Sequence, residues 1–289
     1  MSLDDLAADA PVVTCEWLLE HLDDPRVVVA EISQEADPSG YLAGHVPGAR
    51  GWWWKDVVWD DHEREFPEPA EMAARLGELG VADGQHLVLY APRNQFATYC
   101  YWVMTELCGL DRVHVLDGGK QRWQHLDYPL VQAAATVRPG TRTATAAARD
   151  DRSRIRRDTL LAAVTEGTAP RLVDARSEEE YAGRRVKPGP GLDHGAERHG
   201  RIPGAVSLPY SELFADDGSF RTAEELRERF ARVGAGPQQA DDVVAYCRLG
   251  HRGSLVWFVT TRLLGWDHVR VYDGSWTEWG SMVGVPVER

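Results

Sequence analysis

Cysteine is scarce in this chain, which limits the redox and metal chemistry that can be expected. The 289 residues include four cysteines, and none of these forms a C-x-x-C pair. Zinc ribbons and thioredoxin-like redox motifs are therefore not expected. Cys15, Cys100 and Cys108 lie among apolar residues in helix-like segments and are interpreted as small buried hydrophobic residues. The ten histidines are scattered without the spacing of metal ligands, so no metal site is predicted.

Long apolar runs and a targeting segment are also missing. No stretch approaches the roughly 18 apolar residues that a membrane-spanning helix requires. Residues 1–5 are acidic and lack the basic region and apolar core of a secretory signal. We therefore expect no membrane partner and a cytoplasmic location.

Positive charge is in deficit, because 45 acidic residues outnumber 32 basic ones and leave a net charge of -13. A nucleic-acid partner requires a basic face, so none is expected. A small anionic substrate would need a local cationic site against the overall negative field. Arginines beside a reactive group are therefore informative.

What the sequence does contain is an internal repeat. Shifted by 156 positions, residues 87–123 align without a gap with residues 243–279, and twelve of the 37 aligned positions are identical. Gly44, Pro47, Gly48 and Ala49 align in the same way with Gly200, Pro203, Gly204 and Ala205. Because the identities cluster at matching breaks, we interpret the chain as a duplication.

The duplication and the chain length predict two domains. Residues 132–150 are rich in Ala, Thr and Arg and show neither helix nor strand periodicity, which is typical of a surface linker. The predicted domains are therefore 1–131 and 151–289.

Short apolar runs alternate with helical patterns in each half. In the second half we expect strands at 171–174, 243–246 and 269–272, and helices at 159–166, 222–233, 254–264 and 275–279. Thr222 and Glu225 have the spacing of a capping box at the start of the second of these helices. Strand, helix and strand in this order imply right-handed crossovers and a parallel sheet with helices on both faces. Each half is predicted to be a small α/β domain.

The segment 245–254 joins a predicted strand to a predicted helix and contains Cys247. A chain leaving a parallel strand emerges at the carboxyl edge of the sheet, where α/β folds place ligands. A loop curled around Cys247 would direct backbone N–H groups and a helix start toward it, which favours the thiolate. Gly250 permits the tight curl, and Arg248 and Arg252 add positive charge. We interpret Cys247 as a nucleophile that meets an anion; the alternative is a buried structural cysteine beside solvated arginines.

Two further loop positions bear on the chemistry. His251 is expected either to tune the entry of an acceptor molecule or to face solvent. Leu249 offers no group for proton transfer. In the first repeat Ala91 occupies the place of Cys247, so the first domain is predicted to be catalytically inactive.

Three segments resemble the tandem-domain rhodaneses, the thiosulfate sulfurtransferases. They are the loop Cys-Arg-Leu-Gly-His-Arg at 247–252, Tyr-Leu-Ala-Gly-His-Val-Pro-Gly-Ala at 41–49 and Tyr-Asp-Gly-Ser-Trp-Thr-Glu-Trp-Gly-Ser at 272–281. The resemblance implies two rhodanese-like domains, a persulfide on Cys247 in the second domain, an inactive first domain, and no metal or organic cofactor.

The sequence departs from that family at several positions. Glu31 replaces a frequent strand-end Asp, whereas Asp174 is retained in the second repeat, and Arg201 replaces a histidine. Glu180 stands where thiosulfate-preferring relatives often have a basic residue. Arg184 or Arg185 is the candidate replacement for that anion contact. Both belong to an insertion at 184–199, which is expected to be a surface loop that helps to select the acceptor.

The resemblance implies transfer of the outer sulfur of thiosulfate, through Cys247, to cyanide, a thiol or a sulfur-acceptor protein. Arg248 and Arg252 would orient the sulfonate, or Arg252 would instead be tied to a carboxylate such as Asp174 or Glu178.

Three alternatives remain open. A 3-mercaptopyruvate sulfurtransferase usually has Cys-Gly-Ser-Gly, which Arg248 and Leu249 do not match. A cysteine phosphatase of the same fold needs five residues between Cys and Arg, whereas Cys247 and Arg252 have four between them. A non-enzymatic sulfur carrier or scaffold would use the tryptophan-rich stretch at 52–59.

Overall fold

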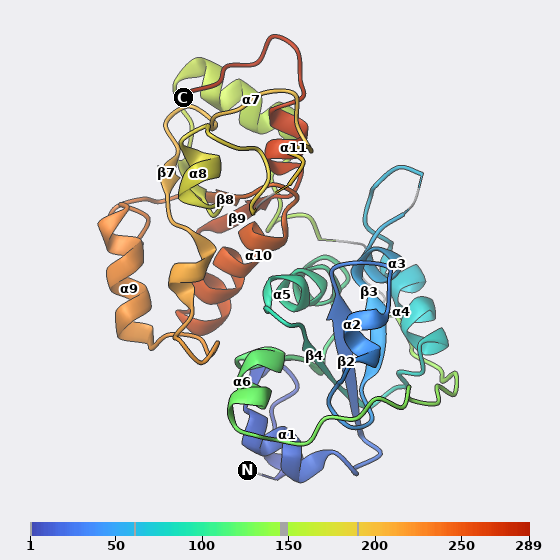
Figure 1. The fold of residues 1–289 in the computed structure, drawn as a ribbon. Coiled ribbons are helices and arrows are strands. Elements are labelled where there is room, and N and C mark those ends of the chain that lie inside the picture. The colour runs from blue at the N-terminus through green and yellow to red at the C-terminus, as the bar shows by residue number, and fades with distance from the viewer. Residues whose placement is uncertain (1, 61, 145–149, 190) are drawn as a thin grey trace. The chain divides into compact units, whose positions relative to one another are not determined.

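The computed structural model describes residues 2–60, 62–144, 150–189 and 191–289. They form two compact units, one of Met1–Asp150 with Asp216–Phe220 and the other of Asp151–Ala215 with Arg221–Arg289. Each unit contains one parallel sheet with helices on its faces, as predicted (Figure 1). The linker bounds 132–150 stay a prediction, and residues 145–149 lie outside the described residues.

The first unit is built on a five-stranded parallel sheet with the order β1-β5-β4-β2-β3. Its strands are β1 (Val12–Val13), β2 (Val27–Ser33), β3 (Arg50–Trp53), β4 (His86–Tyr90) and β5 (Val113–Leu116). The central strand β4 is buried along its whole length, as expected for a parallel strand covered on both faces. Val88 and Tyr90 face one side and Leu87 and Leu89 the other, because strand side chains alternate.

Helices cover both faces of this sheet (Figure 1). Helices α1 (Cys15–His21) and α6 (Gly119–His125) pack together on the side of Val88 and Tyr90. Helices α3 (Trp54–Val58), α4 (Pro69–Glu78) and α5 (Gln95–Trp102) lie on the other side. The shorter elements are η1 (Leu3–Asp5), α2 (Ser39–Leu42) and the π-helical η2 (Val103–Leu107).

The second unit has a four-stranded parallel sheet with the order β7-β6-β8-β9. Its strands are β6 (Arg171–Asp174), β7 (Val206–Ser207), β8 (Val243–Tyr246) and β9 (Val269–Tyr272). The three strands predicted from apolar runs therefore have the predicted bounds. The counterpart of β1 is reduced to a single parallel bridge between Arg154 and Val271.

Three of the four helices predicted here agree closely with the structure. They are α7 (Arg157–Glu166), α9 (Ala223–Arg232) and α11 (Ser275–Trp279); α8 (Glu178–Tyr181) and η3 (Tyr210–Leu213) complete this part of the unit. The capping box of α9 is confirmed, since Thr222 Oγ1 accepts from the Glu225 amide and the Glu225 carboxylate accepts from the Thr222 amide.

The fourth prediction, a helix from residue 254, is wrong in its start. Helix α10 (His251–Trp257) begins three residues earlier and continues as the π-helical η4 (Phe258–Leu263). The residue that precedes the helix is Gly250, whose φ of 94° lies in the left-handed region. Glycine adopts this conformation without the strain a side chain brings, so it lets the chain turn directly from loop to helix. The π-helical segments of the two repeats, η2 and η4, fall at matching places.

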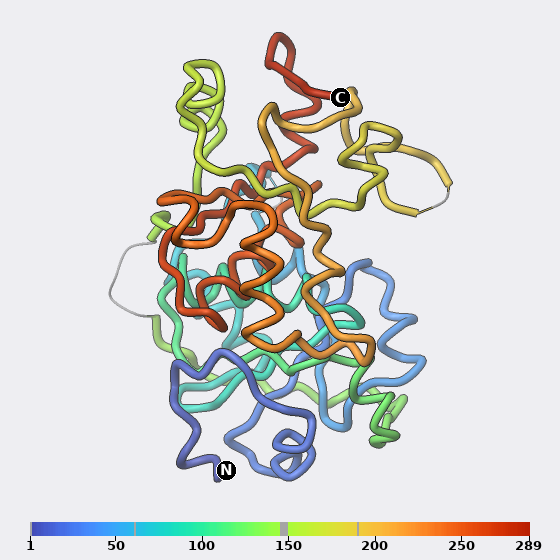
Figure 2. Tube along the Cα trace, turned by 90° about the vertical axis from the view of Figure 1, so that its left-hand side faces the viewer, coloured from blue at the N-terminus to red at the C-terminus, as the bar shows by residue number. Residues whose placement is uncertain are grey.

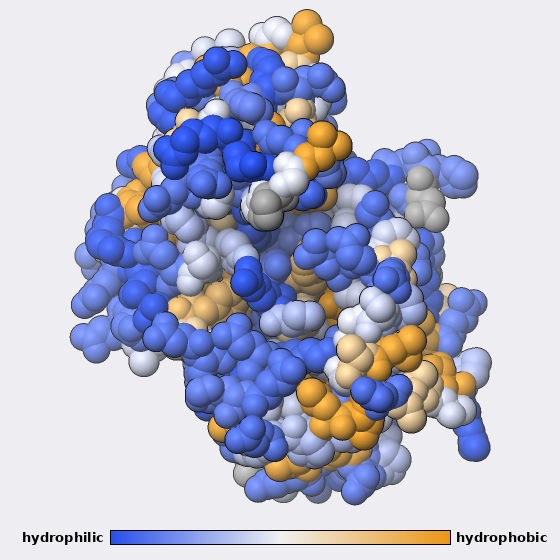
Figure 3. Space-filling model, in the orientation of Figure 1, coloured by the Kyte–Doolittle hydropathy of each residue, from blue (hydrophilic) through white to orange (hydrophobic). Residues whose placement is uncertain are grey.

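Each unit has its own apolar core. In the second, Trp276 and Trp279 of α11 and Leu160 of α7 pack against Val244 and Tyr246 of β8. Hydrophilic residues dominate the face drawn in Figure 3, with hydrophobic residues gathered in smaller clusters. Across the part of the chain that the structure describes, none of the helices has the length and apolar character needed to cross a membrane.

Candidate active site

Cys247 directly follows β8 and lies at the carboxyl edge of the second sheet, four residues before α10 begins. Its residue surface is 1% exposed. The Cys247 amide donates to Ser275 Oγ at 3.0 Å, and the Cys247 carbonyl accepts from the Trp276 amide at 2.9 Å. Helix α11 therefore holds the cysteine backbone from both sides.

Ser275 was not predicted as a site residue. It has a φ of 53°, an unusual conformation for a residue with a side chain, and its Oγ donates to the Tyr272 carbonyl at 2.8 Å. The serine thereby joins the end of β9 to Cys247. Its only sequence signal is its place after the repeated Asp-Gly pair, where the first repeat has Gly119.

The turn between Cys247 and α10 leaves backbone donors available. Among the described residues, none accepts a hydrogen bond from the amides of Leu249, Gly250, Arg252 or Gly253. The first amides of a helix have no partner within it and carry its positive dipole end. The Leu249 and Gly250 amides belong to the turn after Cys247 and the Arg252 and Gly253 amides to the first turn of α10, so an anionic sulfur atom can be stabilised here.

Arg252 is fixed by a carboxylate that the sequence did not indicate. Both terminal nitrogens of its guanidinium donate to Glu180, at 2.7 and 2.9 Å, and Glu180 is completely buried. Arg252 is therefore tied to a carboxylate, one of the two alternatives expected, but the partner is Glu180 and not Asp174 or Glu178. Arg252 lies within the loop, but Glu180 lies on α8, 72 residues away in sequence.

The protonation of this pair follows from its surroundings. Burial tends to raise the pKa of Glu180, but hydrogen bonds and charge from Arg252 outweigh it, and the pKa lies below its ordinary value. Burial tends to lower the pKa of Arg252, yet hydrogen bonds and charge from Glu180 raise it overall, with a further electrostatic contribution from Cys247. Glu180 and Arg252 are therefore both charged at neutral pH. Arg252 also interacts electrostatically with Cys247.

The remaining loop residues lie in different surroundings. Arg248 is half-buried and one of its terminal nitrogens donates to the His194 carbonyl of the insertion at 3.3 Å. Leu249 is half-buried. His251 is only 6% exposed, so the expectation that it could face solvent is wrong.

Asp174 supports the sheet instead of the loop. It accepts from Arg176 Nη2 at 2.6 Å and from the Tyr246 hydroxyl at 2.7 Å, and all three residues are buried. The first repeat has the same arrangement with other residues: Glu31 accepts from Lys120 Nζ at 2.9 Å and from the Tyr90 hydroxyl at 2.7 Å. The departure at Glu31 is therefore compensated by a lysine.

The described residues of the insertion at 184–199 form a loop (Figure 2). Hydrogen bonds from its own side chains hold this loop together. Arg185 donates to the carbonyls of Lys187 and Gly191, and Asp193 accepts from the Val186 and Lys187 amides. Arg184 is exposed. A compensating anion contact from Arg184 or Arg185 stays a prediction, and residue 190 lies outside the described residues.

In the matching loop of the first repeat, a side chain binds the backbone. Asn94 Oδ1 accepts from the Ala91 amide at 3.3 Å, and Asn94 Nδ2 donates to the Leu116 carbonyl at 2.7 Å. A side chain at Gly119, the counterpart of Ser275, would come within 2.5 Å of both Ala91 O and Asn94 Oδ1. The Cys247 amide of the second repeat thus donates to Ser275, whereas the corresponding Ala91 amide of the first repeat donates to Asn94.

The described residues contain no group of three or more His, Cys, Asp or Glu side chains arranged to hold a metal ion. A buried cysteine on a tight loop at a sheet edge, with amides and a paired arginine beside it, is an arrangement that suits a cysteine nucleophile.

Comparison with known proteins defines the family. The rhodanese-like domain profile matches twice, at residues 14–126 and 157–282, and the chain belongs to the rhodanese family. Sulfur carrier protein TtuD of Thermus thermophilus is 38% identical over 282 residues, covering 96% of each chain. A Mycolicibacterium smegmatis protein named "Putative thiosulfate sulfurtransferase" is 37% identical over 284 residues, covering 98% of this chain and 99% of its own.

The solved structure of SseA from Escherichia coli, described as a 3-mercaptopyruvate sulfotransferase, superimposes with a TM-score of 0.72 at 27% identity. The superposition covers 92% of this chain and 98% of the SseA chain. The chain is thus a rhodanese-family sulfurtransferase, and its relatives differ in the donor or role that their names state.

Proposed function

We propose that this protein transfers the outer sulfur atom of thiosulfate to cyanide, a thiol or a sulfur-acceptor protein through a persulfide on Cys247. The observation that supports this most is the loop after Cys247, where four amides lack acceptors among the described residues and the buried Arg252 is close to the thiol. An anion on Cys247 is the species that such a loop stabilises.

The reaction has two displacement steps. The Cys247 thiolate attacks the outer sulfur of thiosulfate, a new S–S bond forms, and the bond to the sulfonate sulfur breaks with its electron pair, which releases sulfite. The acceptor, as cyanide or a thiolate, then attacks the outer sulfur of the persulfide. Thiocyanate or a new persulfide leaves, and the Cys247 thiolate is restored without any change in net oxidation state.

The site residues have distinct proposed roles. Cys247 is the nucleophile, and the backbone from Arg248 to Arg252 surrounds its sulfur. Arg248 is the arginine proposed to meet the sulfonate, because both terminal nitrogens of Arg252 are engaged by Glu180. Arg252 acts as a positioning residue that keeps positive charge near the thiol.

Thiosulfate is preferred over 3-mercaptopyruvate as donor because of two side chains. When thiosulfate is the donor, the leaving group is sulfite, which needs no proton. When 3-mercaptopyruvate is the donor, a hydroxyl beside the cysteine helps proton transfer. Leu249 has no such group, and Arg248 offers a cation for the sulfonate. Steady-state rates with both donors test the assignment: a higher kcat/KM for thiosulfate is expected, and a clear preference for mercaptopyruvate would overturn it.

A sulfur-carrier role is the second candidate, because a relative 38% identical to this chain is named a sulfur carrier protein. The chemistry at Cys247 is shared, and the difference lies in the acceptor. In the cytoplasm, the compartment that the sequence favours, small thiols are kept reduced and can act as acceptors. A carrier would load one sulfur from thiosulfate and turn over slowly with cyanide or dithiothreitol; an enzyme with small acceptors would turn over rapidly.

A further inference from the structure

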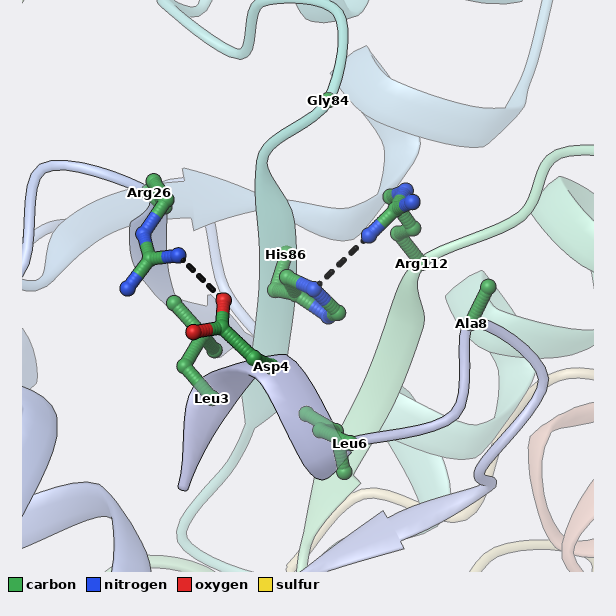
Figure 4. Close-up of a pocket in the computed structure, with 8 residues that line it drawn as sticks. All are labelled: Leu3, Asp4, Leu6, Ala8, Arg26, Gly84, His86 and Arg112. Carbon is green, nitrogen blue, oxygen red and sulfur yellow. Dashed lines mark hydrogen bonds and ion pairs between the residues drawn. The ribbon is translucent and has the colours of Figure 1, made fainter.

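A pocket of about 250 Å³ lies in the first unit, where the strands of the sheet begin (Figure 4). His86 is the first residue of β4, Arg112 directly precedes β5, and Arg26 directly precedes β2. The lining residues are Leu3, Asp4, Leu6, Ala8, Arg26, Gly84, His86 and Arg112. This edge of the sheet is opposite to the edge that bears Ala91, so the pocket is separate from the loop that matches the active site.

A chain of hydrogen bonds fixes the tautomers of two buried histidines. His114 Nδ1 lies 2.6 Å from the Ala10 carbonyl, which can only accept, so Nδ1 carries the proton. His114 Nε2 then accepts from His86 Nδ1 at 2.8 Å. His86 Nε2 is left as an acceptor, and it receives a hydrogen bond from Arg112 at 2.9 Å. Within this hydrogen-bonded series, the atom that can take up a proton next to the pocket is therefore His86 Nε2.

The two arginines that line the pocket differ in their partners. Arg26 forms ion pairs with Asp24 and Asp4, both at 2.7 Å. Arg112 has no carboxylate partner among the described residues, and its guanidinium bonds only to the neutral His86 ring. It also has a φ of 54°, a strained conformation that persists only where other interactions hold it.

The charged groups that face His86 come from several elements. They are Arg112, Arg26, Asp111 and Arg142. Burial and the nearby arginines lower the pKa of His86, and Asp111 opposes this weakly. His86 is therefore neutral at pH 7 in the absence of a further anion.

The second repeat provides an internal comparison. At the positions of His86 and His114 it has Asp242 and Arg270, which form an ion pair at 2.5 Å. At the position of Arg112 it has His268. The arginine at this edge of the second sheet is thus paired with a carboxylate, whereas Arg112 of the first repeat has no carboxylate partner among the residues that the structure describes.

We propose that this pocket binds a small oxyanion, such as sulfate, phosphate or a carboxylate, between Arg112 and Arg26, with a proton taken up at His86 Nε2. The anion receives N–H donors from Arg112, whose bond to His86 is released when Nε2 is protonated. Protonated His86 then donates from Nε2 to the anion while its Nδ1–H bond to His114 is kept. Asp4 is an internal competitor, since its carboxylate is bound by Arg26 and its side chain is 81% exposed.

Calorimetric titration of the full-length Cys247→Ser variant tests the proposal in a protein that cannot form a persulfide, and the pocket variants described below separate this binding from any binding at the active-site loop. Sodium sulfate, sodium phosphate and sodium acetate are the probes, with sodium chloride at matched ionic strength. We expect saturable binding that is absent with chloride, uptake of up to one proton per site, and an affinity that rises as pH falls from 8 to 6, by at most about tenfold per pH unit. The ranking of the three probes identifies the class of oxyanion.

Variants assign the binding to this pocket. Arg112→Asn should abolish binding, and asparagine tolerates the left-handed backbone conformation at this position. Asp4→Asn should strengthen binding about two- to fivefold, because it removes the competing carboxylate. Arg270→Gln is the matched control, since it removes an arginine from the same edge of the second sheet and should leave binding unchanged.

A nuclear magnetic resonance titration of the His86 ring in the Cys247→Ser protein is independent of whether Arg112→Asn folds. Its pKa should rise when sulfate or phosphate is added. Absence of saturable binding, binding unaffected by Arg112→Asn in a folded protein, or an unchanged His86 titration would each overturn the proposal. None of these outcomes bears on the function of Cys247.

Discussion

The Arg252 guanidinium has lost most of its contact with water, so its charge depends on a carboxylate inside the protein. Glu180 supplies that carboxylate. It also accepts a hydrogen bond from the amide of Ser177, the residue that directly precedes α8. One side chain therefore caps a short helix and fixes the active-site loop. A basic residue at this position, as expected in thiosulfate-preferring relatives, would leave Arg252 without its partner.

Replacing Glu180 by Gln should lower the free energy of unfolding by about 3–5 kcal/mol, because Arg252 remains buried without a counter-charge. Sulfur transfer should fall at least tenfold as the loop loses its anchor. Chemical denaturation and steady-state kinetics measure the two effects. The Glu180→Gln/Arg252→Met double variant should recover a large part of the stability but not the activity; equal recovery of both would contradict a role for Arg252 beside the thiol.

Ser275 combines a hydrogen bond to the Cys247 amide with a strained backbone, and two substitutions separate these effects. Ser275→Ala keeps the strain and removes the hydroxyl, whereas Ser275→Gly removes both. Both variants should lose activity to a similar extent, about tenfold, while Ser275→Gly should be more stable than Ser275→Ala by about 1 kcal/mol. Kinetics and thermal unfolding provide the comparison, and full activity in either variant would remove the serine from the site.

At the scale of elements, the same strand-loop-helix unit occurs twice with different contents. In the second repeat the segment after Cys247 leaves four amides without an acceptor among the described residues; in the first, Asn94 Oδ1 accepts from the Ala91 amide. The absence of a cysteine is therefore only one of the reasons for expecting the first loop to be inactive. The Asn94 side chain, which stands where the second repeat has Gly250, is the other.

Introducing Ala91→Cys into the Cys247→Ser protein should consequently give no sulfur uptake from thiosulfate. Adding Asn94→Gly and Gly119→Ser should restore a measurable but low level, because these changes empty the loop and supply the missing hydroxyl. Intact mass after incubation with thiosulfate distinguishes the variants. Uptake by Ala91→Cys alone would show that the Asn94 side chain does not block the loop.

The elements of the second repeat could largely be predicted from the sequence, because buried parallel strands are short apolar runs with clear breaks. The start of α10 could not. Ser254 is a favourable helix cap by residue type, but the chain turns at Gly250 so that the helix begins within the loop. The pairing of Arg252 with Glu180 was equally inaccessible, since side-chain direction across 72 residues is set by packing and not by local pattern.

At the scale of the molecule, duplication has produced two units with similar sheets and different buried polar groups. The first has paired imidazoles where the second has an ion pair. Burial lowers the pKa of His114 to about 4 and also lowers the pKa of His86. Both histidines therefore stabilise the folded state when they are neutral, and protonation of either one destabilises it.

The first unit should therefore lose stability as the solution is acidified. A histidine with a lowered folded pKa contributes stability above the ordinary pKa of about 6.5, and this is lost as pH falls toward 4. We expect hydrogen exchange in β4 and β5 to accelerate between pH 6.5 and 4.5, beyond its intrinsic pH dependence, by an amount equivalent to about 2–3 kcal/mol. The acceleration should be weaker in His114→Asn, and an identical pH response in both proteins would contradict the assignment.

The proposal that Cys247 holds the transferred sulfur is tested most directly by intact mass spectrometry of the protein after incubation with thiosulfate. We expect a gain of one sulfur atom, its removal by cyanide with formation of thiocyanate, and no gain in Cys247→Ala. An unchanged mass in the folded wild-type protein, or the same gain in Cys247→Ala, would contradict it.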